Sequence, residues 1–470
     1  MNLFGLDGGQ KEAVGLNFVL EQLNAASPYG REKVRQIAPF RDLERLEECF
    51  DNIDKILTLC CENMGAIEEI CGLLGHFKDI RATVEKCKSA PLGEVELFEV
   101  KSFLLALARL LPALESVCLK GIEFEPMAAA LDVLDPGKKR VAPFSIEDET
   151  SGALLNLRRR KRVLEAQIQR EKGESRDKLL QERTKVVAAE DIEEMRIMED
   201  LSRRLRRFAP AFLANMEALG QLDFVIAKAL LAINFGAKRP KISSGRLMLS
   251  NMSNPHVAQD LAAKGNQFTK ISISLDVGTT IITGANMGGK SIAIRTAVLN
   301  TALCGLGFFV FAEKAEIPLF DGICLVSEDL QDARGGLSSF GAEIVRLKDI
   351  LSLSRSSFLF IALDEPARAT NPAEGAAIVR AAAAHFNQSG CVCLISTHYD
   401  GVTSDNMKHY QVAGLDASAQ AVKAAFIGDY MDYRLIEASA DTPPARDALR
   451  ICRMLELDEE LLSKIEAELI

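Results

Sequence analysis

Eight consecutive residues have the types and the spacing of a phosphate-binding loop. They are Gly284, Ala285, Asn286, Met287, Gly288, Gly289, Lys290 and Ser291, which match G-x-x-x-x-G-K-[ST] in full. Glycines let backbone N–H groups surround phosphate oxygens without Cβ clashes, and a helix that starts here adds positive partial charge. Lys290 is predicted to bind the β- and γ-phosphates, and the Ser291 hydroxyl to bind Mg²⁺. The segment therefore predicts a nucleotide site.

Both flanks of this loop favour the same interpretation. Thr279–Thr283 form a short β-rich run before the loop, and residues 292–303 have the composition of a helix after it. A glycine-rich loop that arose by chance is the alternative. The strand before the loop and the helix after it argue against that alternative, because the motif needs this context.

A second run of residues ends in two acids. Phe358 to Leu363 are continuously apolar, and Asp364 and Glu365 follow directly. Such a run is typical of a buried central strand that carries carboxylates to its C-terminal tip. Asp364 is predicted to hold Mg²⁺, and Glu365 is predicted to polarise the attacking water as the general base.

A third run predicts another buried strand with a polar tip. Residues 391–395 (CVCLI) are apolar, and Ser396, Thr397, His398 and Tyr399 follow. His398 at this tip is predicted to orient or sense the γ-phosphate; the alternative is a histidine with a purely structural role.

A fourth segment combines flexible glycines with hydroxyl groups at the start of a helix. Gly335 and Gly336 precede Ser338 and Ser339, and helical spacing begins near Glu343. This pattern suits an anion-binding loop, and it also suits an ordinary capped helix.

The rest of the chain divides by its hydrophobic periodicity. Apolar residues recur at helical spacing through residues 1–135, which predicts an all-α domain. Residues 136–238 predict long helical arms that reverse near Gly173, and Pro240 ends the helical region. Residues 239–440 alternate strand-like and helical runs, which predicts an α/β domain, and residues 441–470 predict a helical tail.

Composition and charge limit the class of protein. The net charge of −10 argues against a protein that coats nucleic acid non-specifically. Eleven cysteines without a C-x-x-C pair, together with only five histidines, predict free thiols in a reducing cytosol and no zinc site. The N-terminal residues lack the pattern of a signal peptide, and no uninterrupted apolar stretch is long enough to span a bilayer. We therefore expect a cytoplasmic protein without membrane contact.

Two arginine clusters lie in the region of the predicted arms. They are residues 158–162 (RRRKR) and 203–207 (RRLRR), and the acidic run 190–194 lies between them in the sequence. A solvated helix face, neutralised by these acids, is favoured over a contact with nucleic acid.

Together these motifs resemble the MutS family of ABC-type ATPases, whose members include DNA mismatch repair proteins. TGANMGGKS is close to the family's TG-P-N-M-G-G-K-S, GGLSSFGAEI resembles its signature loop, and STHYD resembles its histidine switch. Upstream, ASPYGREKVRQIAPF and LGQLDFVIAKALLA resemble the family's helical core and lever region. The resemblance therefore covers nearly the whole chain.

The resemblance implies a fold, cofactors and partners. The fold would be a C-terminal α/β P-loop NTPase domain of ABC/MutS type (239–440), preceded by an all-α core (1–135) and by lever arms with a reduced clamp (136–238). ATP and Mg²⁺ would be the cofactors, and Phe268 would stack on adenine. Ser338 and Ser339 would act in trans in a homodimer, or in a dimer with a MutS-like paralogue, and duplex DNA would be the default client.

Several features depart from the family's pattern. The mismatch-reading and connector domains have no counterpart in this sequence, the clamp is reduced to a helical hairpin, and no nuclease-like extension follows Ile470. The family's D-E-x-G-R-G-T-S is replaced here by a sequence with Ala367, Ala369 and Asn371 in place of two glycines and a serine. The loop after Glu365 is therefore expected to be stiffer, and hydrolysis slower or differently coupled.

These observations lead to three functional hypotheses. The first is a dimeric, ATP-hydrolysing switch of the mismatch repair family that does not itself read mismatches. The alternative is an ATP-dependent chaperone that reactivates an adenosylcobalamin-dependent aminomutase of lysine or ornithine type, which the altered loop and the negative net charge favour. The third is a nucleotide-binding scaffold that rarely hydrolyses ATP, and the presence of Glu365 argues against it.

Overall fold

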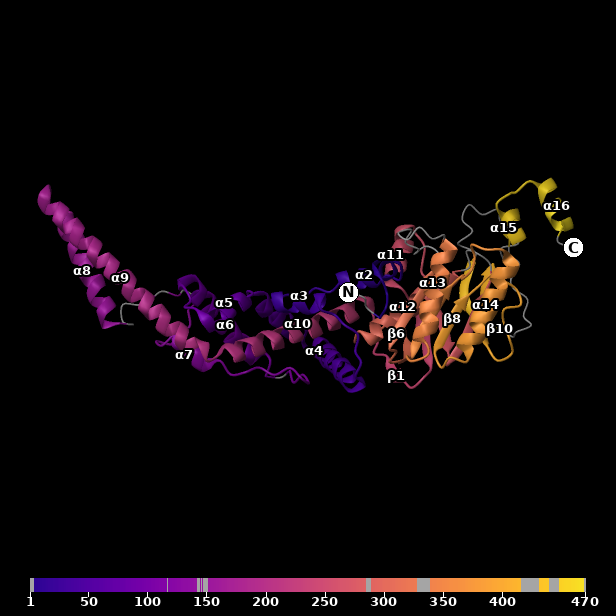
Figure 1. The fold of residues 1–470 in the computed structure, drawn as a ribbon, viewed down its shortest axis with the longest axis horizontal. Coiled ribbons are helices and arrows are strands. Elements are labelled where there is room, and N and C mark those ends of the chain that lie inside the picture. Colours follow the sequence, from indigo (N-terminus) through magenta and orange to yellow (C-terminus); the bar gives the residue numbers. More distant parts are fainter. Residues whose placement is uncertain are drawn as a thin grey trace. The chain divides into compact units, whose positions relative to one another are not determined.

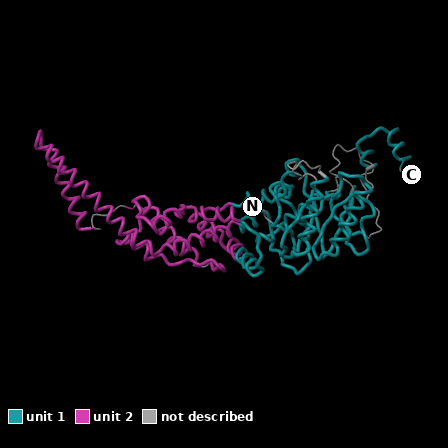
Figure 2. Tube along the Cα trace, in the orientation of Figure 1, with its two compact units in different colours: residues 1–23, 37–54, 228–470 teal, residues 24–36, 55–227 magenta. Residues whose placement is uncertain are grey.

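The protein is described by a computed structural model that covers residues 4–115, 117–141, 144, 146, 151–284, 289–327, 339–415, 431–438 and 448–468. The chain forms two compact units (Figure 2). Unit 1 contains residues 1–23, 37–54 and 228–470, and unit 2 contains residues 24–36 and 55–227. Each unit is discontinuous in sequence, so the predicted domain boundaries at residues 135, 238 and 440 stay predictions.

Unit 2 is built from helices (Figure 1). They are α3 (Pro28–Arg35), α5 (Arg81–Ser89), α6 (Glu94–Ala113), α7 (Ala128–Leu134), α8 (Gly152–Ile168) and α9 (Glu174–Arg206), with most of α4 (Leu43–Gly75) and α10 (Ala209–Phe235). The aromatic rings of Phe77 and Phe212 both contact the ring of Phe103, at centroid distances of 5.3 and 5.8 Å. These contacts form part of an apolar core between helices.

Helix α10 alone, among the described helices, is long and apolar enough to cross a membrane. Its most apolar stretch is 67% buried inside the protein. Such burial is typical of a core helix of a protein, which needs apolar residues on several faces because other elements pack around it.

Helices α8 and α9 form an antiparallel pair that reverses at Gly173, where φ is +63°. Across the pair, the guanidinium group of Arg158 binds Glu190 at 3.1 Å and Glu194 at 2.7 Å. Lys161 also pairs with Glu190. The acidic run thus neutralises part of the first arginine cluster, which supports its interpretation as ion-paired, although Glu190 is buried between the two helices rather than solvated.

Unit 1 contains a six-stranded sheet with the order β10-β9-β4-β8-β7-β6 (Figure 1). The strands are β4 (Gly278–Thr283), β6 (Gly322–Ser327), β7 (Leu359–Asp364), β8 (Val392–Ser396), β9 (Lys408–Leu415) and β10 (Met431–Ala438). All neighbouring strands are parallel except β9 and β10. Every residue of β4, β7 and β8 is buried, as their continuous apolar runs predict.

Helices cover both faces of this sheet. Helix α12 (Lys290–Gly305) contacts β6, β7 and β8, while α13 (Ser339–Leu353) and α14 (Pro372–Asn387) pack with the same strands in an apolar core. In that core Ile361 and Ile395 of the sheet lie among buried residues that include Val379 and Phe386 of α14. The sheet is therefore the middle layer of an α/β arrangement.

Unit 1 contains a second sheet with the order β1-β5-β2-β3. Its strands are β1 (Lys241–Ser243), β2 (Leu247–Met252), β3 (Ile271–Leu275) and β5 (Lys314–Pro318). The other helices of unit 1 are α1 (Gly8–Ala13), α2 (Leu16–Glu21), α11 (Pro255–Ala263), α15 (Ala448–Met454) and α16 (Glu459–Glu468). The prediction of an α/β region that follows a large helical region is confirmed. All eleven cysteines lie within the described ranges, and each is a free thiol.

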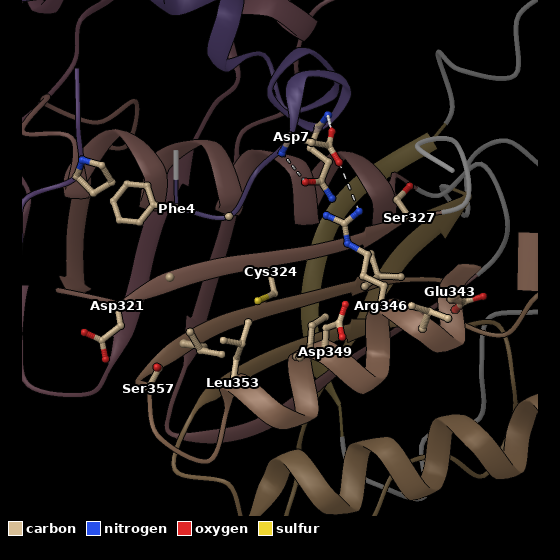
Figure 3. Close-up of a pocket in the computed structure, with 18 of the residues that line it drawn as sticks. Phe4, Asp7, Asp321, Cys324, Ser327, Glu343, Arg346, Asp349, Leu353 and Ser357 are labelled. Atoms are coloured by element: carbon tan, nitrogen blue, oxygen red, sulfur yellow. Dashed lines mark hydrogen bonds and ion pairs between the residues drawn. The ribbon is translucent and has the colours of Figure 1, made fainter. Parts of the chain in front are cut away.

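The N-terminal segment covers the edge strand β6. The N–H group of Ile323 donates to the Phe4 carbonyl at 2.9 Å, and the Gln10 amide donates to the Leu325 carbonyl at 2.7 Å. Figure 3 shows this segment, with Phe4 and Asp7, beside Cys324 of the strand. Pairing of this kind protects an edge whose backbone groups would otherwise be open to another chain.

A buried carboxylate organises the start of α3 in unit 2. Asp223 accepts hydrogen bonds from the Ser27 N–H at 2.7 Å, the Ser27 hydroxyl at 2.6 Å and the Ala26 N–H at 3.0 Å. Gly30 lies against this carboxylate so closely that a Cβ atom there would be 2.1 Å from Asp223 Oδ2. Glycine is therefore required at position 30, because any Cβ atom there would clash with the Asp223 carboxylate.

We expect Gly30→Ala to lower the thermal midpoint by at least about 5 °C, because the methyl group must displace Asp223 from three donors. The matched control is Gly72→Ala in α4, where a Cβ atom would meet nothing within 4 Å. Alanine is the better helix former there by about 1 kcal/mol, so the control midpoint should stay constant or rise. Thermal denaturation followed by circular dichroism measures both variants, and equal shifts would contradict the assignment.

Candidate functional site

The C-terminal ends of three neighbouring strands meet at one edge of the six-stranded sheet. In the strand register Asp364 of β7 lies opposite Ser396 of β8, and Ser396 lies opposite Ile282 of β4. The loop that follows β4 therefore starts next to the two acids that end β7. The predicted motifs, although far apart in sequence, are brought together by this register.

The described ends of the glycine-rich loop have the expected backbone geometry. Residues Ala285, Asn286, Met287 and Gly288 lie outside the described residues. Gly284 has φ +136° and approaches Val412, and Gly289 has φ +84° as the N-cap residue of α12. Both values are favourable for glycine alone among the common residues.

Lys290 lies across this loop and is almost fully buried, with 3% of its surface exposed. Its Nζ donates to the Gly284 carbonyl at 2.8 Å and lies 3.1 Å from Glu365 Oε1. The other carboxylate oxygen of Glu365 lies 3.2 Å from the guanidinium group of Arg368. Two cations therefore hold the predicted general base.

The predicted magnesium ligands touch each other. The Ser291 hydroxyl donates to Asp364 Oδ1 at 3.0 Å, and the Ser396 hydroxyl donates to the same oxygen at 2.8 Å. A hydroxyl and a carboxylate oxygen at this separation suit Mg²⁺, which takes few protein ligands and completes its shell with water and phosphate oxygens. The described residues contain no cluster of three or more His, Cys, Asp or Glu side chains arranged for a metal.

Burial raises the pKa of the Asp364 carboxyl above its ordinary value. The hydroxyl groups of Ser396 and Ser291 and the charge of Arg295 act in the opposite direction, and the charge of Glu365 adds to the rise. A buried carboxylate with mainly neutral partners is costly in the absence of a cation. This cost is what binding of a metal ion would relieve.

A cavity of ≈ 490 Å³ adjoins these residues. Lys290, Ser291 and Glu365 are among its polar lining residues, and Phe268 is among its apolar ones. Its volume and its mixture of aromatic and charged groups suit a nucleotide. The structure thus places Phe268 in the same cavity as the loop, as its predicted role requires.

Strand β10 contributes two cavity residues that were not predicted from the sequence. Met431 and Tyr433 of β10 also line the cavity, and a Cβ atom on Gly289 would lie 2.9 Å from the Tyr433 ring. The only local signal for Tyr433 in the sequence is that it is an aromatic residue in a run that alternates between apolar and polar residues. No spacing links this strand to the glycine-rich loop, because the contact depends on the order of strands in the sheet.

His398 follows β8 and is exposed, and its ring lies 4.3 Å from the Tyr399 ring. Desolvation by the neighbouring protein lowers the pKa of His398, the charge of Glu365 opposes this, and the charges of Lys290 and Arg368 add to the lowering. The imidazole therefore favours its neutral form.

The segment that resembles a signature loop lies mostly outside the described residues. Ser338 is among the residues not described, and Ser339 begins α13 without a description of its side chain. The predicted roles of both serines stay predictions.

The unusual loop after Glu365 contains left-handed backbone. Glu365 has φ +50° and Ala367 has φ +59°, whereas Ala369 has no positive φ. For a residue with a Cβ atom this conformation costs about 1 kcal/mol. Asn371 caps α14 by accepting from the Ala373 N–H at 3.0 Å, a role that asparagine performs as well as serine.

A parallel sheet whose central strand enters a glycine-rich loop, and whose neighbour ends in two acids, is the arrangement of P-loop nucleotide-binding proteins. Residues 280–461 match the model of the family described as MutS domain V. This match covers the loop, both acids and His398. Residues 280–461 therefore belong to the MutS family.

Relatives with this similarity occur in several bacteria. The chain is 28% identical over 276 residues to Endonuclease MutS2 of Caldanaerobacter subterraneus, which covers 58% of this chain and 33% of the relative. It is 25% identical to Endonuclease MutS2 of Fusobacterium nucleatum, over 99% of this chain and 58% of the relative. It is 33% identical to the DNA mismatch repair protein MutS of Thermus thermophilus, over 43% and 24%. The chain thus spans less than two thirds of each relative's length.

We expect Asp364→Asn to raise the thermal midpoint of the nucleotide-free protein, because the amide keeps an acceptor for both serine hydroxyls without a buried charge. The same variant should lose the increase in midpoint that Mg²⁺ with ATP gives to the wild type. The control Asp79→Asn removes a carboxylate whose pKa is lowered by its hydrogen bond to Arg81, so it should not stabilise the protein. Differential scanning fluorimetry with and without Mg-ATP measures both effects, and a destabilised Asp364→Asn variant would contradict the prediction.

Proposed function

We propose that this chain binds and hydrolyses ATP as a dimeric, MutS-type switch. The observation that carries the proposal is the arrangement of two adjacent pairs at one edge of one sheet, Lys290 with Glu365 at 3.1 Å and Ser291 with Asp364 at 3.0 Å. Membership of the MutS family supports the same activity. These residues supply a phosphate-binding cation, two ligands for Mg²⁺ and a group that can position water, which are recurring parts of phosphoryl-transfer sites.

Each of these groups has a role in the proposed reaction. The glycine-rich loop with Lys290 binds the β- and γ-phosphates, and Phe268 with Tyr433 binds the base. Ser291 and Asp364 would hold Mg²⁺, which neutralises charge on the phosphates when it is bound. Glu365 accepts the proton of the attacking water, and His398 orients the γ-phosphate.

The contact between Lys290 and Glu365 gives a physical link between binding and catalysis. Lys290 Nζ carries one positive charge, which already faces Glu365 Oε1 and the Gly284 carbonyl, so a bound phosphate would compete with Glu365 for it. A triphosphate that attracts Lys290 would therefore weaken its hold on one oxygen of the general base. This exchange couples occupancy of the site to its activation.

Duplex DNA is the proposed macromolecular partner, and a second copy of the chain or a MutS-like paralogue is the proposed dimer partner. The names of the relatives, a DNA mismatch repair protein and endonucleases, support DNA. Ser338 and Ser339 would then complete the partner's site in trans, in a cytoplasmic protein that does not itself read mismatches. An aminomutase client finds no support among these relatives, although the ion-paired arginines of α8 favour a client other than nucleic acid.

We expect Glu365→Gln to lower kcat for ATP hydrolysis by about a hundredfold or more while ATP binding is kept, because only the proton acceptor is lost. Lys290→Ala should instead weaken ATP binding by at least about tenfold. The control is Glu374→Gln, the same change at an exposed residue in the first turn of α14. A phosphate-release assay and calorimetric titration measure both quantities, and unchanged turnover in either site variant would refute the proposal.

We expect the protein to bind duplex DNA with an affinity that falls steeply between about 50 and 200 mM salt. Because Arg160 already pairs with Glu182, Arg160→Ala should change this affinity by less than about twofold. Fluorescence anisotropy with a labelled duplex, with and without ATP, measures the constants. Absence of binding at about 10 μM protein would contradict the DNA partner, and ATP-dependent co-purification with an aminomutase would then support the alternative.

A further inference from the structure

The left-handed peptide at Ala367 is held from both sides by buried side chains. Its N–H group donates to Glu343 Oε1 at 2.7 Å, and its carbonyl accepts from the Tyr399 hydroxyl at 2.8 Å. Glu343 lies on α13 and Tyr399 lies directly after His398. Three separate segments of the chain therefore meet at one residue, whose two flanking peptide groups are each held by one hydrogen bond.

This contact is almost completely shielded from water. The exposed fractions of Ala367, Tyr399 and Glu343 are 1%, 8% and 9%. Hydrogen bonds at low local dielectric are stronger than in water, and one that involves a carboxylate is stronger still. Gly375 leaves the space for it, because a Cβ atom there would lie 2.3 Å from the Tyr399 hydroxyl and 2.8 Å from the Ala367 carbonyl.

The contact also compensates for strain beside the general base. Glu365 and Ala367, on either side of Pro366, both have left-handed backbone. Strained residues persist only where surrounding contacts determine their conformation. Glu365 itself is held at its N–H by the Ser396 hydroxyl at 2.9 Å, so the bonds to Ala367 complete the definition of this short loop.

We propose that Glu343 and Tyr399 are positioning residues that hold the Ala367 peptide and thereby set the position of the Glu365 carboxylate. Neither residue contacts the nucleotide cavity. Glu343 lies one helical turn after Ser339, where α13 begins, and Figure 3 shows it at the opposite end of α13 from Leu353. A displacement at the start of α13 therefore reaches the general base of the same chain through one side chain.

This inference rests on the proposed ATPase function, because it concerns the position of the proposed general base.

The experiment compares four single variants of the full chain for ATP hydrolysis. Tyr399→Phe removes one hydroxyl, Glu343→Ala removes the acceptor, and Glu343→Gln keeps an acceptor oxygen for the Ala367 N–H. The matched control is Tyr410→Phe, which removes a buried hydroxyl that bonds to the Ser274 backbone on β3.

We expect Tyr399→Phe and Glu343→Ala each to lower kcat about tenfold with KM within about twofold, because loop geometry changes while the binding surface stays. Glu343→Gln and Tyr410→Phe should keep kcat within about threefold. An unchanged kcat in Tyr399→Phe, or a rise in KM that matches the fall in kcat, would overturn the inference. Tyr399→Phe decides the question if Glu343→Ala does not fold.

Hydrogen exchange separates this inference from the proposed function. In the wild type the Ala367 amide should exchange slowly, and in Tyr399→Phe and Glu343→Ala it should exchange at least about tenfold faster, while Tyr410→Phe leaves it unchanged. If the wild type did not hydrolyse ATP, the proposed function would fail, and equal exchange rates in all variants would still independently overturn the role of Glu343 and Tyr399.

Discussion

The ion pair between Lys290 and Glu365 joins the two parts of the candidate site. Lys290 belongs to the loop after β4 and Glu365 to the loop after β7, and both side chains are largely buried. Buried charges need partners, and each of these two groups is a partner of the other. The pair exists only because β8 sets β4 and β7 in a register that makes their C-terminal ends level. The arrangement of the sheet is therefore the condition for the chemistry.

Asp364 lies at the same edge of the sheet, but its hydrogen-bond partners are neutral, whereas those of Glu365 are cations. Its carboxylate is buried with two serine hydroxyls, which both donate to Oδ1 without neutralising its charge. The site thus carries an electrostatic cost that a divalent cation would relieve, whereas the neighbouring Glu365 is already paired with cations. Two adjacent acids acquire different roles because their surroundings differ. Strain at Glu365 and Ala367 adds a second cost, which contacts with Glu343, Tyr399 and Ser396 offset.

In the helical unit, ion pairs between two long helices are prominent. Its long α8 and α9 helices expose many charges, and Arg158, Lys161, Glu190 and Glu194 pair across the two helices. Interpretation of the arginine cluster as ion-paired was available from the sequence, since the acidic run has the right charge and lies on the facing arm. Conversely, the close approach of Gly30 to Asp223 had no local signal, because the two residues are nearly two hundred positions apart.

Local patterns in the sequence determined the elements of the site. The apolar runs of β4, β7 and β8, the glycine-rich loop and the helix after it are all encoded within short windows, since backbone preference and hydrophobic periodicity act over a few residues. The order of the strands, by contrast, was decided only by the tertiary structure. It placed Tyr433 beside Gly289, the N-terminal segment on β6, and Glu343 and Tyr399 around Ala367. These contacts depend on packing between distant segments, which is set by the complementarity of whole faces and carries no fixed spacing along the chain.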